Sequence, residues 1–267
     1  MKTAAEGTVL DKIAKSTRAR IEKAKRDIPL EKLESMPRRR PVLDFIKAVS
    51  GPEARVIAEV KPKSPSDPVP VDLDPVETGL DYARNGASAI SVLTEPDFFG
   101  GSLDTLRALH ERLSVPLLMK DFFLDPYQVR QALAYGADAA LLMVSLLGRE
   151  GLGEMLAETR KAGLAALVEA YTEEEMAIAL DAKAPLIGVN NRNLKTLGVD
   201  LEVTRRLAAM AKGSGAVLVA ASGLRSRAEL EERRALGYTG FLIGTTLMRS
   251  GRPGAALAEL LGRKPVP

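Results

Sequence analysis

The sequence of 267 residues has no cysteine, no tryptophan and a single histidine, His110. Without cysteine there is no disulfide, no thiolate metal site and no cysteine nucleophile, which fits a reducing compartment. His110 falls inside an expected helix at residues 103–113, so we interpret it as a surface or packing residue. Ser-His-Asp chemistry and a histidine-built metal site are therefore not expected.

Long apolar runs are also missing. No stretch of 18 or more apolar residues and no signal peptide is present, so we expect a cytoplasmic protein with no membrane partner. The net charge is only +3, with basic residues concentrated in 12–25 and 38–40. A nucleic-acid patch would need tighter clustering and interleaved aromatic residues. We interpret these residues as a solvated helix face and a basic linker, and expect no nucleic-acid partner.

What the sequence does contain, from residue 55 onward, is a repeated unit. A short, continuously apolar run is followed by a polar turn and a helical pattern. Runs of this kind are typical of strands buried on both faces of a parallel sheet. The eight runs cover 56–58, 89–93, 116–119, 139–144, 165–168, 186–189, 216–220 and 240–244.

Helical segments such as 103–113, 128–135 and 227–236 lie between the runs, and several end at a glycine that can form a left-handed C-cap. These glycines are Gly86, Gly136, Gly163 and Gly237. Eight strand–helix units predict an α/β fold, a (β/α)8 TIM barrel formed as one domain by residues 1–267. The alternative is an open doubly wound sheet. Such a sheet would be expected to have a glycine-rich dinucleotide-binding turn after the first strand, and residues 59–66 do not form one.

Residues 1–54 are expected to form an N-terminal helical extension. Apolar residues at helical spacing predict an amphipathic helix over 10–28, and a short helix is expected over 43–49.

Barrel enzymes place their active sites at the carboxyl ends of the strands. Five of the eight expected strand ends carry ionisable residues. Each charge near a buried core is costly unless paired, so any one of them can be a structural ion pair, but together they predict two lysines and two glutamates around one cavity. The polar residues at the strand ends are Glu59, Lys61, Ser64, Thr94, Glu95, Lys120, Asp121, Glu169, Asn190, Asn191 and Arg192.

The last two strands end in small residues, Ser222 and Gly223 after the seventh and Gly244 and Thr245 after the eighth. In barrels the loops after these strands often bind phosphate through backbone N–H groups and a short helix N-terminus. A helix beginning at Thr245 would complete such a site. The alternative is two glycine turns with no ligand.

Taken together, these residues resemble the indole-3-glycerol-phosphate synthase family of tryptophan biosynthesis, and the similarity covers the whole barrel. The matching stretches are Ile57–Lys61 with Ser64, Leu93–Glu95 with Phe99–Ser102, Leu118–Phe122, Leu167–Glu169, Gly188–Leu194, Ser222–Gly223 and Phe241–Gly244. The resemblance implies a decarboxylating, dehydrating ring closure of 1-(2-carboxyphenylamino)-1-deoxyribulose 5-phosphate, with no cofactor or metal. A phosphorylated small molecule would be the substrate, and the protein a monomer or weak homo-oligomer.

Residue roles follow from the same resemblance. Lys120 matches the general acid, Lys61 and Glu169 the proton-transfer pair, and Glu59 a contact to the sugar hydroxyls. Ser64, Asn190 and Arg192 match substrate contacts that include the carboxylate. The aryl pocket is matched by Phe99, Phe122, Leu141 and Leu194.

One departure from the family pattern stands out. The pattern at the seventh strand is Ala-Glu-Ser-Gly, and here Ala221 replaces the glutamate. A methyl group cannot accept a hydrogen bond. The change leaves three hypotheses: a working or weakened synthase, a relative with a changed substrate or reaction, or a non-catalytic barrel that binds a phosphorylated ligand. Retention of Lys61, Lys120 and Glu169 argues against the last. Phosphoribosylanthranilate isomerase is disfavoured because its acid/base pair would be expected to include a cysteine.

Overall fold

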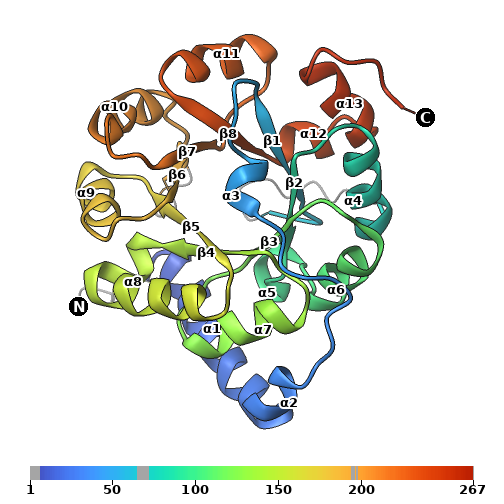
Figure 1. The fold of residues 1–267 in the computed structure, drawn as a ribbon, viewed down its shortest axis with the longest axis vertical. Coiled ribbons are helices and arrows are strands. Elements are labelled where there is room, and N and C mark those ends of the chain that lie inside the picture. Colours follow the sequence, from blue (N-terminus) through green and yellow to red (C-terminus); the bar gives the residue numbers. More distant parts are fainter. Residues whose placement is uncertain (1–6, 65–71, 194–195, 197, 267) are drawn as a thin grey trace, which may run out of the picture.

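A closed barrel of eight parallel strands forms the centre of the molecule (Figure 1). The computed structural model describes residues 7–64, 72–193, 196 and 198–266. Each strand pairs with its neighbours in sequence, and β8 closes the barrel onto β1. The expected TIM barrel is confirmed, and the open sheet is wrong. The strands are β1 Arg55–Val60, β2 Ala89–Leu93, β3 Leu117–Lys120, β4 Ala139–Met143, β5 Ala165–Ala170, β6 Leu186–Asn190, β7 Val217–Ala221 and β8 Tyr238–Ile243.

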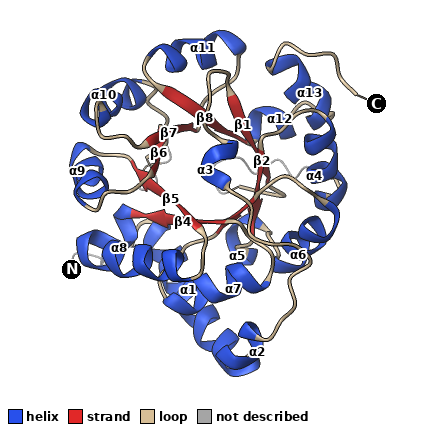
Figure 2. Ribbon diagram, viewed as in Figure 1, coloured by secondary structure: helices blue, strands red, loops and turns tan. Residues whose placement is uncertain are grey.

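Most helices lie outside the ring of strands, and the short helix Phe45–Ala48 (α3) lies over the centre of the ring in this view (Figure 2). The four glycines expected to cap helices all have positive φ, between 71° and 101°, as a left-handed cap requires. The helices are α1 Val9–Asp27, α2 Leu30–Glu34, α3 Phe45–Ala48, α4 Pro75–Arg84, α5 Pro96–Phe99, α6 Leu103–Arg112, α7 Pro126–Ala134, α8 Val144–Lys161, α9 Glu173–Asp181, α10 Glu202–Ala211, α11 Arg227–Ala235, α12 Thr245–Met248 and α13 Pro253–Leu260.

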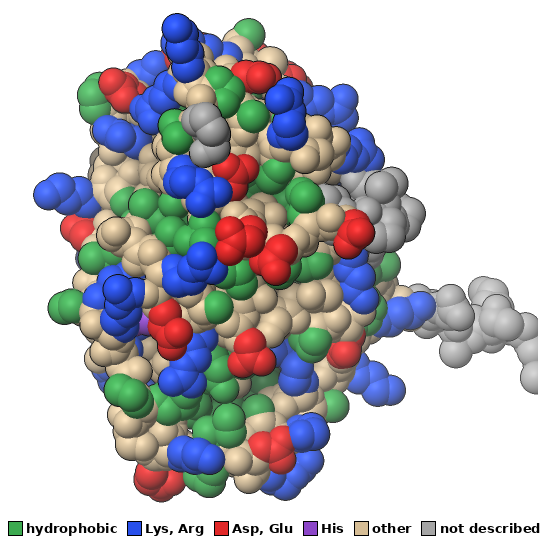
Figure 3. Space-filling model, turned by 90° about the vertical axis from the view of Figure 1, so that its right-hand side faces the viewer, with side chains coloured by type: hydrophobic (Ala, Val, Ile, Leu, Met, Phe, Trp, Pro, Cys, Tyr) green, Lys and Arg blue, Asp and Glu red, His purple; other side chains and the backbone are tan. Residues whose placement is uncertain are grey.

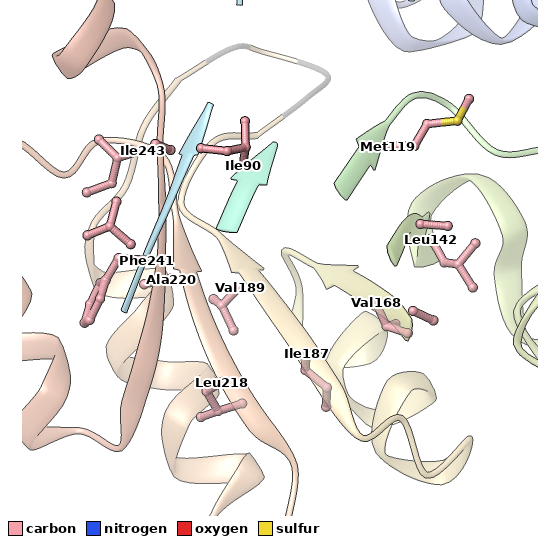
Figure 4. Packing of buried hydrophobic residues seen from close by; sticks show 14 of the residues in the cluster. Ile90, Met119, Leu142, Val168, Ile187, Val189, Leu218, Ala220, Phe241 and Ile243 are labelled. Carbon is pink, nitrogen blue, oxygen red and sulfur yellow. The ribbon is translucent and has the colours of Figure 1, made fainter. Parts of the chain in front are cut away.

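Alternation along the strands divides the buried residues into two cores. Because successive side chains of a strand point to opposite faces, one set lies between strands and helices. This set includes Ile90, Met119, Leu142, Val168 and Phe241 (Figure 4). The other set fills the barrel interior and includes Ile57, Leu118, Leu167, Val219 and Leu242. The same alternation places Glu59, Lys120, Glu169, Asn190 and Ala221 on the inner face.

The helices before β1 lie at different ends of the barrel. Phe45 and Val49, at α3, pack with the interior core, and the carbonyl of Val49 accepts a hydrogen bond from Thr239 near the start of β8. This helix therefore closes the amino-terminal end. By contrast, Leu10 and Ile13 of α1 pack at the carboxyl end, where they line a cavity at the strand ends. Of the three helices before β1, α1 is therefore the one that covers the carboxyl end of the barrel, its mouth.

The arginine run before α3 is not a solvated linker. Arg38 and Arg40 are largely buried, and both guanidinium groups bind the fully buried carboxylate of Asp138, just before β4. Desolvation of Asp138 explains why two cations are drawn inward, because a buried carboxylate needs bonded partners. On the face shown in Figure 3, acidic and basic side chains are interspersed.

His110, which the sequence indicated to be either a surface or a packing residue, is a packing residue. It is buried on α6, and a Cβ at Gly136 would lie 2.2 Å from its ring. No helix among the described residues has the length and apolar character needed to cross a membrane.

Candidate active site at the barrel mouth

A cavity of about 400 Å³ opens at the carboxyl end of the barrel. The strand ends, the loops that follow them and α1 together form its walls. Among the residues predicted from the sequence, those that line the cavity are Glu59, Lys61, Ser64, Phe99, Lys120, Phe122, Leu141, Glu169, Asn190, Arg192, Ser222, Gly223, Gly244 and Thr245. The structure therefore brings together every predicted site residue except Leu194, which lies outside the described residues.

Glu59 lies between the two lysines. Its Oε1 is 3.3 Å from Nζ of Lys61, and its Oε2 is 3.7 Å from Nζ of Lys120. Burial alone would raise the pKa of Glu59, but the two ammonium groups outweigh it and hold that pKa below its ordinary value. One ionised carboxylate thus neutralises part of the charge of both lysines at the cavity floor.

Glu169 has the opposite electrostatic environment. Burial raises the pKa of its carboxyl group, while Lys120 and a hydrogen bond with Asn190 lower it only in part. Asn190, the last residue of β6, also accepts a hydrogen bond of 3.0 Å from the N–H of Arg192 through Oδ1. Two carboxylates with pKa values shifted in opposite directions are the arrangement that separates acid and base roles.

The ends of β7 and β8 form a corner of small residues. Ser222 has φ of 66°, rare outside glycine, and Gly223 follows with φ of 81°. The carbonyl of Ser222 accepts a hydrogen bond from Asn191, which holds this turn in place. Gly244 is required because a Cβ there would lie 2.5 Å from Oε1 of Glu59. Thr245 then begins α12, as expected, so a helix N-terminus adjoins the corner.

Apolar side chains form another part of the cavity wall. The rings of Phe99 and Phe122 lie 5.9 Å apart and are tilted by 39°, and Leu141 adjoins them in the barrel interior. Leu10 and Ile13 of α1 complete this side. Together these side chains form an apolar slot in the cavity wall.

Two strand-end acids have structural roles. Glu95 caps α5 by accepting hydrogen bonds from the N–H groups of residues 97, 98 and 99, so it does not line the cavity. Asp121 adjoins the cavity, but its carboxylate is bound to Arg20 and Thr94. Among the described residues no three His, Asp or Glu side chains form a metal-binding group.

Sequence reasoning missed several residues of the cavity. The contribution of α1 was not identified residue by residue, and Arg225 and Arg249, which lie near the small-residue corner, were not identified at all. Arg225 follows Gly223 by two positions and Arg249 directly follows α12, so their proximity to strand ends seven and eight was the available signal.

The chain is a (β/α)8 barrel whose mouth carries two lysines, two glutamates with opposite pKa shifts and a corner of small residues, an arrangement typical of barrel enzymes. The family model for indole-3-glycerol phosphate synthase matches residues 10–260. The chain therefore belongs to the indole-3-glycerol phosphate synthase family, carboxy-lyases of tryptophan biosynthesis.

Curated relatives agree along the chain. The indole-3-glycerol phosphate synthase of Carboxydothermus hydrogenoformans is 43% identical over 261 residues, covering 94% of this chain and 99% of that protein. The Mycolicibacterium gilvum synthase is 43% identical over 256 residues, covering 95% and 94%. The Aquifex aeolicus synthase is 43% identical over 235 residues, covering 87% and 91%.

Two solved structures share the fold. KGPDC from Streptococcus mutans has a TM-score of 0.58 at 15% identity and covers 78% of this chain and 96% of its own. Thiamine phosphate pyrophosphorylase from Pyrococcus furiosus has a TM-score of 0.55 at 20% identity, covering 77% and 93%. At such low identity the likeness concerns the fold alone.

Proposed function

We propose that this chain converts 1-(2-carboxyphenylamino)-1-deoxyribulose 5-phosphate to indole-3-glycerol phosphate, carbon dioxide and water in the cavity described above. The observation that carries the proposal is the contact of Glu59 with both Lys61 and Lys120 at the mouth of a barrel that matches this family over its length. A proton donor, an ionised carboxylate and an apolar slot are the three features that this ring closure requires.

The first step forms a carbon–carbon bond. The aromatic carbon that bears the carboxylate attacks the ketone carbon of the sugar chain, and the ketone oxygen takes up a proton as its double bond opens. We assign this proton to Lys120, which lies on β3 next to the aryl slot. Glu59, with Oε2 3.7 Å from Nζ of Lys120, places a carboxylate beside this ammonium group.

The later steps restore the aromatic ring. Loss of carbon dioxide leaves its electron pair in the six-membered ring, and the new hydroxyl then departs as water while a proton is removed from the adjacent carbon. Lys61 and Glu169 are the proposed proton-transfer pair. Because burial raises the pKa of Glu169, this carboxyl group can exchange a proton closer to neutral pH than an exposed glutamate can.

Binding is proposed to use the two walls of the cavity. The phosphate would lie on the backbone N–H groups at Gly223, Gly244 and Thr245, beside Ser222, with Arg225 and Arg249 nearby. The aryl ring would lie against Phe99, Phe122 and Leu141. The aryl carboxylate would meet Arg192, Ser64 and Asn190, and Leu194 is expected at the same wall.

Ala221 supports a second candidate function. It lies on the inner face of β7, opposite Asn190 on β6 and Leu242 on β8, so its methyl group offers the sugar no hydrogen-bond acceptor. A relative that acts on a related phosphorylated arylamine, with fewer hydroxyl contacts, would fit this replacement. Steady-state comparison of the two substrate types separates the candidates.

The direct test is an assay of the purified chain with the carboxyphenylamino-deoxyribulose phosphate, following indole fluorescence. We expect product formation that a metal chelator does not reduce. A folded chain that binds an anthranilate-type ligand but forms no indole product would contradict the proposal. We also propose a cytoplasmic monomer or weak homo-oligomer, which size-exclusion chromatography and cell fractionation would check.

A further inference from the structure

Asp121 is a fully buried carboxylate with both oxygens engaged. Oδ1 accepts a hydrogen bond of 2.8 Å from the N–H of Phe122, and Oδ2 accepts one of 2.7 Å from Oγ1 of Thr94. Arg20 supplies the remaining bonds, 2.5 Å to Oδ1 and 3.1 Å to Oδ2. A planar guanidinium group can hold both oxygens at once, so the contact defines orientation as well as distance.

This contact fixes the position of the two neighbouring residues. Lys120 precedes Asp121 and places its ammonium group 3.7 Å from Glu59. Phe122 follows it and lies 5.9 Å, ring to ring, from Phe99. Holding the backbone at Asp121 therefore controls where both the proposed proton donor and one wall of the aryl slot point.

Arg20 belongs to α1, the helix that covers the mouth with Leu10 and Ile13. The same helix and the residue that ends it are also bound to the neighbouring helices α5 and α7. Ser16 donates a hydrogen bond to Asp97, on the short helix that carries Phe99. Tyr127 donates from its hydroxyl group to the carbonyls of Ala24 and Ile28, at 3.0 Å and 2.8 Å.

From this geometry we infer that Arg20 is a positioning residue for the proposed reaction. It locks the Lys120–Asp121–Phe122 segment to the covering helix, and it acts through Asp121 without touching the substrate. The expected effect on turnover rests on the proposed function. The expected effect on binding of an aromatic ligand rests only on the aryl slot.

The test compares three variants of the full chain. Arg20→Met removes both hydrogen bonds, Arg20→Lys keeps a charge that reaches one oxygen, and Arg18→Met makes the same change at an exposed position of the same helix. We expect Arg20→Met to lower kcat by about tenfold or more, since small misplacements of reacting groups are costly. The value of KM should rise by about fivefold, because the loosened aryl slot weakens ground-state binding, and this change is smaller than the loss in kcat.

Arg20→Lys should recover part of kcat, and Arg18→Met should match the parent chain. Arg20→Met with the kcat of Arg18→Met overturns the inference, as does a lower melting temperature with unchanged kcat. If Arg20→Met does not fold, Arg20→Lys decides: an intermediate kcat upholds the role and a parental kcat overturns it.

Binding of anthranilate, followed by its fluorescence, gives a readout that needs no turnover. We expect Arg20→Met to weaken it by about fivefold or more, because the aryl slot is no longer preorganised. Unchanged affinity overturns the positioning of Phe122. If the parent chain binds anthranilate but forms no product, the proposed function fails while this comparison still tests Arg20.

Discussion

Lys61 donates a hydrogen bond of 2.8 Å to Oγ1 of Thr245, which joins the first strand end to the residue that begins α12. The same ammonium group is 3.3 Å from Glu59. A change at the small-residue corner formed by Ser222, Gly223, Gly244 and Thr245 would therefore act directly on Glu59, because Lys61 contacts both Thr245 and Glu59. In the proposed mechanism, Lys61 would therefore couple phosphate binding to proton transfer.

Lys120→Ala is expected to lower turnover by at least about a hundredfold, the lower range for loss of general acid catalysis. The fold should persist, since the side chain ends in the cavity rather than the core. Steady-state kinetics with circular dichroism provide the measurement. Lys161→Ala, at an exposed position far along α8, is the control. Near-normal turnover in the Lys120 variant would remove this residue from the mechanism.

Gly244→Ala is expected to reduce turnover by about tenfold or more and to weaken binding of inorganic phosphate. The added Cβ would lie 2.5 Å from Oε1 of Glu59 and 3.1 Å from its Cβ. Glu59 must then move away from the lysines, at a cost near that of one charged hydrogen bond, about 1.5 to 3 kcal/mol. Gly244 has φ of −123°, so backbone strain does not contribute.

Gly153→Ala is the matched control, because it lies in α8 with no atom within 4 Å of the new Cβ. It should leave turnover unchanged and stabilise the helix by about 0.5 to 1 kcal/mol. A crystal structure with bound phosphate would complete the comparison. Phosphate bound away from Gly223, Gly244 and Thr245 would contradict the assignment.

Ala221→Glu is expected to raise turnover by roughly tenfold or more. One hydrogen bond to a charged group contributes about 1.5 to 3 kcal/mol, and each 1.36 kcal/mol is about a factor of ten in rate. The new carboxylate needs Lys61 or Lys120 as a partner, because Glu59 and Glu169 already lie in the cavity. Melting temperatures would show any cost of the added charge.

Ala221→Gln is the control for size without charge. A gain specific to glutamate supports a weakened synthase. No gain in a folded variant that still binds an anthranilate-type ligand would instead favour the relative with a changed substrate.

The stability of the fold should fall as the pH drops below about 6.5, the ordinary pKa of histidine. Burial, followed by the charges of Arg38 and Arg40, lowers the pKa of His110 in the folded protein. The unfolded chain therefore takes up a proton at a pH where the folded chain does not, and stability is lost until the pH reaches the lowered folded pKa.

Urea unfolding across this range measures the effect. His110→Leu removes the titrating ring while keeping a buried side chain of similar size. We expect the difference in unfolding free energy between the two proteins to depend on pH. A difference that stays constant would mean that His110 does not titrate differently in the two states.

Local sequence was sufficient for the barrel and for much of its mouth. Continuous apolar runs such as 139–143 are typical of strands buried on both faces, and the carboxyl ends of parallel strands meet at one edge. Glu59, Lys120 and Glu169 could therefore be placed in one cavity before any distance was known. The capping glycines were equally predictable, because each left-handed helix end has a local signal.

Tertiary structure decided which of the strand-end charges are available. Asp121 and Lys120 are adjacent in sequence, yet one is bound by Arg20 from a helix 101 residues away and the other faces Glu59. The sequence predicted a solvated linker at Arg38 and Arg40, but in the fold both form ion pairs with the buried Asp138. Charge pairing depends on distance in three dimensions and on burial, and neither can be read from the spacing of residues along the chain. The sequence therefore determined which residue types lie at the mouth. Only the fold determined their electrostatic roles.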